Sequence, residues 1–186
     1  MARAGLDTEA VVAAAAQLAD ADGLEAVTLA RLAATLGVRS PSLYAHVGGL
    51  ADLKRRVAVR GARELAAELQ AAVAGRSRGD ALSAMADAYR AYARAHPGTY
   101  AALQPAPSRD DAEAAGAATD VIEVVLAVLR GYGLEGDEAI HGARIIRAAL
   151  HGFVALETGG GFGIPLALDD SYARLVDVLD RGLSTP

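Results

Sequence analysis

Arg39, Ser40 and Ser42 lie together at the start of a predicted short helix, directly after the tripeptide at 36–38. Side chains on the exposed first turn of such a helix can reach base edges in the DNA major groove, and an arginine can donate two hydrogen bonds to guanine. We therefore predict that these three residues read bases. The alternative interpretation of the same residues is an ordinary solvated helix N-terminus.

The neighbouring sequence predicts the elements that would position these side chains. Gly37 can adopt the positive φ that ends a helix, and Val38 turns the chain back towards the core. Thr28 is a good N-cap, and Pro41 suits a first helical turn. One face of the preceding helix carries the apolar residues Leu29, Leu32, Ala33 and Leu36. Two short helices joined in this way are typical of a helix-turn-helix, whose second helix lies in a major groove.

The charge distribution agrees with this interpretation, although the net charge of the chain is -5. Residues 1–64 carry eight basic and seven acidic side chains, whereas residues 65–186 carry ten basic and sixteen acidic ones. Within residues 28–63 there are seven Lys and Arg against Asp52 alone. Positive charge concentrated in this way attracts phosphates.

Composition predicts the fold class and argues against several kinds of protein. Hydrophobic residues make up 53% of the chain and aromatic ones only 4%, and alternating apolar and polar positions are rare, which favours helix and no sheet. The absence of cysteine rules out disulfides and thiolate metal sites. We expect no metal and no cofactor. The N-terminus lacks a signal-peptide core and no long apolar run occurs, so we expect a cytoplasmic protein without a membrane segment.

Capping residues, glycines and prolines predict an all-α chain of about nine helices. The expected helices cover residues 7–21, 28–36, 40 to the break at 48–49, 50–73, 80–95, 97–103, 109–130, 137–158 and 169–183. The first three helices form a head, and the long fourth helix joins it to a helical body. We expect a DNA-binding domain at 1–49, a connecting helix at 50–75 and a ligand-binding and dimerisation domain at 76–186.

The motifs resemble a known family. The sequences Asp-Gly-Leu-Glu-Ala-Val-Thr, Leu-Ala-x-x-Leu-Gly-Val and Ser-Pro-Ser-Leu-Tyr-Ala-His-Val occur in order within residues 7–60. This order is similar to the N-terminal domain of TetR family transcriptional regulators. Residues 95–100 and 150–160 resemble the C-terminal domain named for a Trp-His-Gly motif, with Leu150 in the place of the tryptophan.

The resemblance implies a homodimer that places its two third helices in successive major grooves of a partly palindromic, double-stranded operator. Thr28, Tyr44 and His46 match positions that usually contact phosphate in the family. The family commonly has a lysine near the start of the fourth helix, where this chain has Leu50. Lys54 or Arg55, one turn later, could substitute for it, as could backbone N–H groups of the helix N-terminus.

The resemblance also implies that a small-molecule effector binds in the body and changes the separation of the two heads. The residues that belong to the helices lining the pocket in the family are Tyr89, Tyr92, Tyr100, Leu103, His141, Arg144, Phe153 and Phe162. An aromatic or apolar residue at helical spacing is more often simply part of a core. The sequence does not identify the effector.

The last two predicted helices are apolar over more than one stripe, which indicates a partner surface. In the family, these helices form a four-helix bundle with their counterparts across a two-fold axis. A symmetric dimer is also what a palindromic operator requires. The predicted interface residues are Leu150, Tyr172, Leu175, Val176 and Leu179.

The leading hypothesis is a ligand-responsive transcriptional repressor, and two alternatives to it remain. An enzyme with a helix-turn-helix appendage would need catalytic groups, but the chain offers only four scattered histidines and carboxylates without metal-ligand or acid-base spacing. A nonspecific or architectural DNA-binding dimer would keep the basic stripe without a sequence preference. Activation and repression are not distinguished by the sequence.

Overall fold

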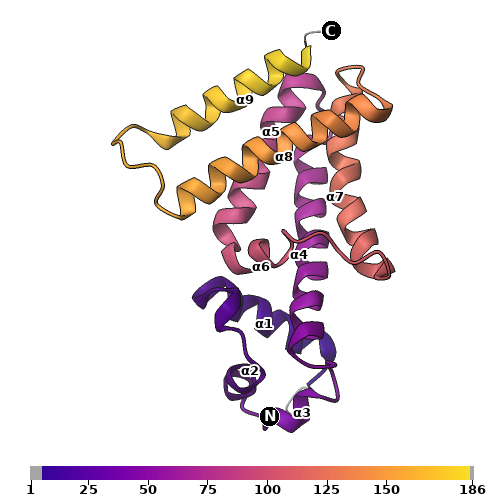
Figure 1. The fold of residues 1–186 in the computed structure, drawn as a ribbon, viewed down its shortest axis with the longest axis vertical. Coiled ribbons are helices and arrows are strands. Elements are labelled where there is room, and N and C mark those ends of the chain that lie inside the picture. The colour runs from indigo at the N-terminus through magenta and orange to yellow at the C-terminus, as the bar shows by residue number, and fades with distance from the viewer. Residues whose placement is uncertain (1–5, 185–186) are drawn as a thin grey trace. The chain divides into compact units, whose positions relative to one another are not determined.

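The computed structural model describes residues 6–184, and within this range it contains α-helices and a 3-10 turn but no strand (Figure 1). The all-α prediction is confirmed. The helices are α1 (Thr8–Asp22), η1 (Leu24–Ala26), α2 (Leu29–Leu36), α3 (Ser40–Leu43), α4 (Leu50–Val73), α5 (Arg78–Ala95), α6 (Pro97–Ala102), α7 (Ala112–Arg130), α8 (Gly136–Thr158) and α9 (Leu168–Ser184). Helix α3 is shorter than expected, because residues 44–46 form a turn and do not continue the helix.

Contacts divide the chain into two compact units. The first unit comprises the described residues up to Arg63 together with Ala95–Ala118, and the second comprises Glu64–Arg94 together with the described residues from Thr119 onward. Helices α4 and α7 each contribute to both units. The first unit therefore contains the predicted head and, in addition, α6 and the first turns of α7.

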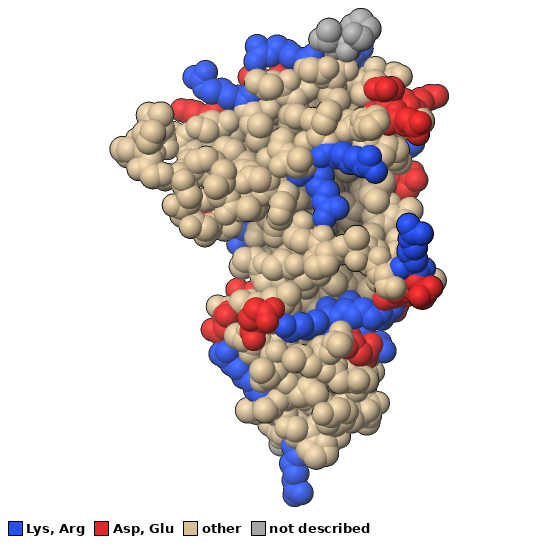
Figure 2. Space-filling view, viewed as in Figure 1, with Lys and Arg blue, Asp and Glu red and all other residues tan. Residues whose placement is uncertain are grey.

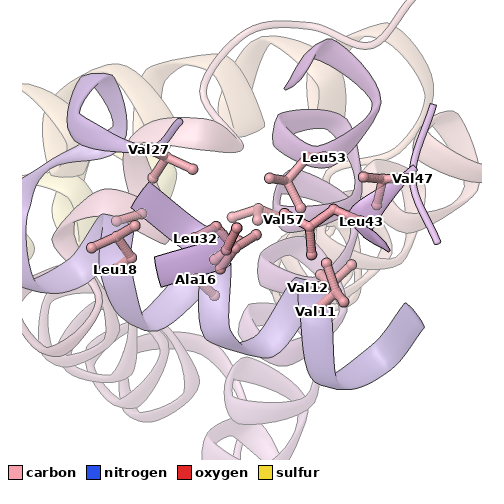
Figure 3. Close-up of a cluster of buried hydrophobic side chains, with 13 residues drawn as sticks. Val11, Val12, Ala16, Leu18, Val27, Leu32, Leu43, Val47, Leu53 and Val57 are labelled. Carbon is pink, nitrogen blue, oxygen red and sulfur yellow. The ribbon is translucent and has the colours of Figure 1, made fainter. Parts of the chain in front are cut away.

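The first unit is built around apolar side chains from four helices. Helix α1 begins at an Asp7 cap, whose Oδ1 accepts a hydrogen bond of 2.7 Å from the backbone N–H of Ala10. The buried residues of the cluster come from α1, α2, α4, the turn before α2 and the segment at 43–47 (Figure 3), and they are Val11, Val12, Ala15, Ala16, Leu18, Ala19, Val27, Leu32, Ala33, Leu43, Val47, Leu53 and Val57. This cluster ties the helix-turn-helix to α1 and to the first turns of α4.

Helix α6 packs on α1 at unusually short range. A Cβ atom on Gly98 would lie 2.0 Å from the carbonyl oxygen of Ala19, so no larger residue fits there. The Asp20 carboxylate accepts hydrogen bonds from the backbone N–H of Thr99 at 2.7 Å and from its hydroxyl at 3.1 Å. The Nδ1 atom of His96 lies 3.1 Å from the same carboxylate. Asp20 of α1 thereby satisfies donors in the first turn of α6, as an N-cap normally does.

In the second unit, α9 runs back along α8 (Figure 1). The Tyr172 hydroxyl donates a hydrogen bond of 2.6 Å to the backbone oxygen of Ala86 in α5. No helix in the described part of the chain has the length and apolar character needed to cross a bilayer.

The predicted interface residues of α8 and α9 face mostly inward. The four that are buried within the chain itself are Leu150, Tyr172, Val176 and Leu179. Leu175 is partly buried. These four side chains are thus already covered within a single copy of the chain, and Tyr172 contacts α5. Their place in a dimer interface stays a prediction. The large apolar side chains that these helices leave exposed are Ile140, Ile145, Leu156 and Val178.

Candidate nucleic-acid interface

The turn between α2 and α3 is fixed by backbone hydrogen bonds and by one glycine. The Thr28 hydroxyl caps α2 by accepting a hydrogen bond of 3.2 Å from the backbone N–H of Arg31. Gly37 ends α2 in the left-handed conformation with φ of 65°. The N–H of Val38 donates to the carbonyl of Ala33 at 3.0 Å. This arrangement sets the direction in which α3 begins.

Helix α3 is anchored on one side and open on the other. Leu43 is fully buried, and Val47 beyond the helix is also buried. Arg39, Ser42 and Tyr44 are exposed, whereas Ser40 is half-buried. Tyr44 exposes 63% of its surface, which is unusual for a tyrosine. Helix α3 and its flanking residues therefore expose a guanidinium group, hydroxyl groups and an aromatic ring to solvent, while Leu43 and Val47 anchor them to the core.

Six of the seven basic side chains in residues 28–63 form ion pairs. Figure 2 shows that Lys and Arg lie beside Asp and Glu on one face of the molecule. The partners are Arg31 with Asp22, Lys54 with Glu25, Arg55 with Asp111 and Glu113, Arg56 with Asp52, Arg60 with Glu9, and Arg63 with Glu113. Within residues 6–184, no carboxylate pairs with Arg39. The local excess of positive charge is thus largely compensated in the folded chain, except at α3.

The predicted phosphate ligands lie in different surroundings. Thr28 and Tyr44 are exposed, and His46 is half-buried. Lys54 Nζ lies 3.1 Å from Glu25 Oε1. Arg55 binds Asp111 through Nε and, at 2.5 Å, through Nη2. The first two side chains are thus available to DNA as they stand, whereas Lys54 and Arg55 already have carboxylate partners.

The first turn of α4 carries its own charge pattern. The Asp52 carboxylate accepts hydrogen bonds from Arg56 Nε at 2.9 Å and from the backbone N–H of Gly48 at 2.8 Å. These two hydrogen bonds, Arg56 first, hold the pKa of Asp52 below its usual value. Leu50, the residue in the place of the family's lysine, is partly exposed at the start of the helix.

The predicted effector residues are divided between the two units. Tyr100 and Leu103 belong to the first unit, and the other six belong to the second. The buried members of the set are Tyr89, Tyr92, Tyr100 and Phe153. His141, Arg144 and Phe162 are exposed, and Leu103 is partly buried. The structure brings two of them into direct ring contact, because the centroids of Phe153 and Phe162 are 5.0 Å apart.

Sequence reasoning missed the buried cation of the second unit, Arg90. Its Nη2 and Nε atoms bind both oxygens of Glu157 at 2.6 and 2.8 Å, and its Nη1 lies 2.8 Å from Asp169. Its guanidinium also stacks 4.7 Å from the centroid of the Tyr172 ring. The hydrogen bonds to Glu157 raise the pKa of Arg90, so it stays charged. Its position on the apolar face of α5 was the available signal.

A surface hollow of about 420 Å³ lies where α7 ends and α8 begins. Its lining residues are Leu126, Arg130, Leu134, Glu135, Gly136, Asp137, Ala139 and Ile140, and none of the predicted effector residues is among them. In the described part of the chain, no group of three or more His, Asp and Glu side chains is placed to hold a metal ion.

The braced helix-turn-helix with its solvent-facing polar side chains defines a DNA-binding protein of the helix-turn-helix class. A family model described as "Tetracyclin repressor-like, C-terminal domain" matches residues 82–179. The HTH-type transcriptional regulator Rv0681 of Mycobacterium tuberculosis is 42% identical over 158 residues, which are 84% of this chain and 72% of that protein. This chain belongs to the TetR family of transcriptional regulators.

Two further proteins resemble the chain. The HTH-type transcriptional repressor DrrR1 of Streptomyces coeruleorubidus is 35% identical over 135 residues, which are 73% of this chain and 47% of that protein. A TetR variant from Acinetobacter baumannii AYE, crystallised in complex with minocycline, superposes with a TM-score of 0.73 over 96% of each chain. At 19% sequence identity, this second likeness shows the fold alone.

Proposed function

We propose that the chain is a ligand-responsive transcriptional repressor that binds a palindromic operator as a homodimer and is released by a small-molecule effector. The observation that carries the proposal is the exposed surface of α3, where Arg39 has no internal carboxylate partner in the described chain and Tyr44 is largely open to solvent. The repressor named DrrR1, which shares 35% identity with this chain, supports the sign of the regulation.

In this proposal, Arg39, Ser40 and Ser42 read base edges, and Arg39 makes a bidentate contact with guanine. Thr28, Tyr44 and His46 hold the phosphate backbone on either side, which sets the register without reading sequence. The backbone N–H groups at the start of α4 supply the contact that the family's lysine makes elsewhere, because an anion is favoured at a helix N-terminus.

The proposed dimer uses the exposed face of α8 and α9. Ile145 and Leu156 are eleven residues apart, about three helical turns, so they lie on the same face of α8. Val178 of α9 is also exposed. Two-fold pairing of this face places two copies of α3 on one duplex, and half-sites in such operators lie about 34 Å apart. In domain terms, residues 1–49 bind DNA, residues 50–75 connect and residues 76–186 bind the effector and the partner copy.

The competing function is that of a nonspecific DNA-binding dimer. Six ion-paired cations argue against it, because sequence-independent affinity comes from cations that neutralise phosphates. A nonspecific binder needs such charge available on its surface.

Selection of bound duplexes from a random pool tests the proposal. We expect enrichment of a partly palindromic sequence, and tighter binding of it than of a random duplex at every salt concentration. Equal binding of both duplexes, with equal loss as salt rises, would contradict it. A screen for small molecules that release the protein from the enriched duplex then tests the effector step.

A further inference from the structure

An acidic residue directly before helix α7 binds α4. Asp111 precedes α7, and its Oδ1 accepts a hydrogen bond of 3.0 Å from the backbone N–H of Ala114, so it caps the helix. The same carboxylate receives both Nε and Nη2 of Arg55. Arg55 Nη2 also lies 3.0 Å from Glu113, which in turn pairs with Arg63 at 3.2 Å. We call these four residues, Arg55, Arg63, Asp111 and Glu113, the α4–α7 clamp.

The pair of Arg55 and Asp111 in the clamp is a bidentate arginine–carboxylate interaction rather than a single contact between surface charges. Two parallel N–H···O bonds from a guanidinium to one carboxylate fix its orientation as well as its distance. The Asp111 side chain is 19% exposed and that of Arg55 31%, so water screens the pair only in part. Its hydrogen bond with Arg55, and next the bond from Ala114, lower the pKa of Asp111 to about 2, and the partners of Arg55 raise its own pKa.

The clamp acts on the same stretch of α4 that supports α3. Leu53 and Val57, two residues on either side of Arg55, are buried in the cluster that includes Leu43 of α3. One side of this stretch therefore packs under the helix-turn-helix, and the other side is held by Asp111. All of these residues belong to the first unit.

The acidic residues of this segment also neutralise the unit. By sequence, residues 1–63 and 95–118 contain nine Lys and Arg and nine Asp and Glu, and three of the acids lie at 110–113. DNA phosphates would therefore have to displace two carboxylates to reach Arg55.

We infer that Asp111 is a positioning residue for DNA binding: through Arg55 it holds the first turns of α4, and hence α3, in the orientation that fits the major groove. This inference rests on the proposed function. It differs from the interpretation, suggested by the sequence, that Arg55 contacts phosphate directly.

The two roles of Arg55 predict opposite results for Asp111→Asn in the full-length protein on its selected operator. Asparagine keeps the N-cap of α7 but removes the charge, so the variant tests the clamp alone. If the clamp positions α4, Asp111→Asn and Arg55→Gln each weaken operator binding by roughly three- to tenfold, and the double variant is no weaker than either single variant. The slope of log affinity against log salt stays unchanged, because no phosphate contact is lost.

If Arg55 instead binds phosphate, Asp111→Asn strengthens binding, and Arg55→Gln reduces the salt slope by about one. Either result overturns the inference. Asp110→Asn is the matched control, because it removes one charge from the neighbouring residue, which has no ion-pair partner in the described chain. It should bind like the wild type. Far-UV circular dichroism and urea unfolding verify that each variant is folded at the temperature of the assay.

The controls separate a failure of this inference from a failure of the proposed function. If the wild type enriches no duplex, the proposed function fails. If the wild type and Asp110→Asn bind the operator and Asp111→Asn binds it equally well, the inference about the clamp fails and the proposed function stands.

Discussion

Arg39 is the basic residue of the helix-turn-helix whose guanidinium has no carboxylate partner in the described chain, and it stands at the start of α3. An unpaired guanidinium at this position can form two hydrogen bonds with guanine. We expect Arg39→Ala to relax the preference at one base pair of the operator by about 1 to 3 kcal/mol. Competition titrations with operators that differ at single positions measure this effect.

Tyr44→Ala serves as the comparison for Arg39→Ala. Because a phosphate contact carries no sequence information, this variant should weaken binding to all duplexes by about the same factor. An Arg39→Ala protein with an unchanged pattern of preferences would remove Arg39 from the set of base-reading residues. A Tyr44→Ala protein with altered preferences would show that the ring reads bases.

Gly98 permits the close packing of α6 on α1, because any Cβ atom would overlap the carbonyl of Ala19. We expect Gly98→Ala to lower the free energy of unfolding by about 1 to 3 kcal/mol, since the helices must move apart and strain the hydrogen bonds between Asp20 and Thr99. Urea unfolding measures this change.

Gly116→Ala is the control for this substitution. Gly116 lies inside α7, and no atom comes within 4 Å of the place that an added methyl group would take, so an alanine there should stabilise the helix by about 0.5 to 1 kcal/mol. Equal effects of the two substitutions would show that the contact between α6 and α1 is loose in solution.

The residue scale also shows where sequence reasoning succeeds. Thr28 and Gly37 take the capping roles predicted for them, because both depend on neighbours within five positions. Asp20 and Thr99 are 79 residues apart, and Arg55 and Asp111 are 56 apart. Nothing local specifies such pairs, since they depend on how helices pack after they have formed.

At the scale of elements, the order of the nine helices within residues 6–184 was predictable from caps, glycines and prolines. The burial of the predicted interface residues of α8 and α9 within the chain itself was not predictable. Their apolar stripes are wide enough to supply both a core and an outer face, and the sequence does not say which residues take which role. The side chains of Leu150 and Tyr172 are buried, whereas those of Ile145 and Val178 are exposed.

The charge state of the clamp between α4 and α7 gives a prediction on pH. Asp111 has a pKa of about 2 in the folded chain against an ordinary value of 3.8, so the folded state binds its proton less readily than the unfolded state. The stabilisation is therefore complete above the ordinary value and disappears as the pH falls towards about 2.

Urea unfolding of the wild type and of Asp111→Asn over a pH series tests this. We expect the difference in unfolding free energy to be constant above about pH 5 and to shrink below about pH 4. A difference that persists undiminished down to about pH 2 would show that the Asp111 carboxylate contributes through something other than its charge.

At the scale of the whole molecule, the proposed function makes operator binding depend on a second copy of the chain. Ile145 exposes 55% of its surface and Val178 57%, and neither contributes to the core of its own chain. We expect Ile145→Lys to weaken dimerisation by at least about tenfold, because the proposed two-fold pairing of α8 and α9 would place two desolvated ammonium groups in an apolar interface. Sedimentation equilibrium measures the dissociation constant of the dimer.

The Ile145→Lys variant should keep a folded DNA-binding head but lose tight operator binding. A monomer binds one half-site at a time, so it loses the increase in affinity that comes from two linked heads on one duplex. Ile122→Lys makes the same chemical change on α7, at a residue that is 46% exposed, and should leave both association and operator affinity unaltered. If Ile145→Lys still sediments as a dimer while Ile122→Lys becomes monomeric, then the partner surface lies on α7. The two-fold axis that spaces the α3 helices would then have to pass beside that helix rather than beside α8 and α9.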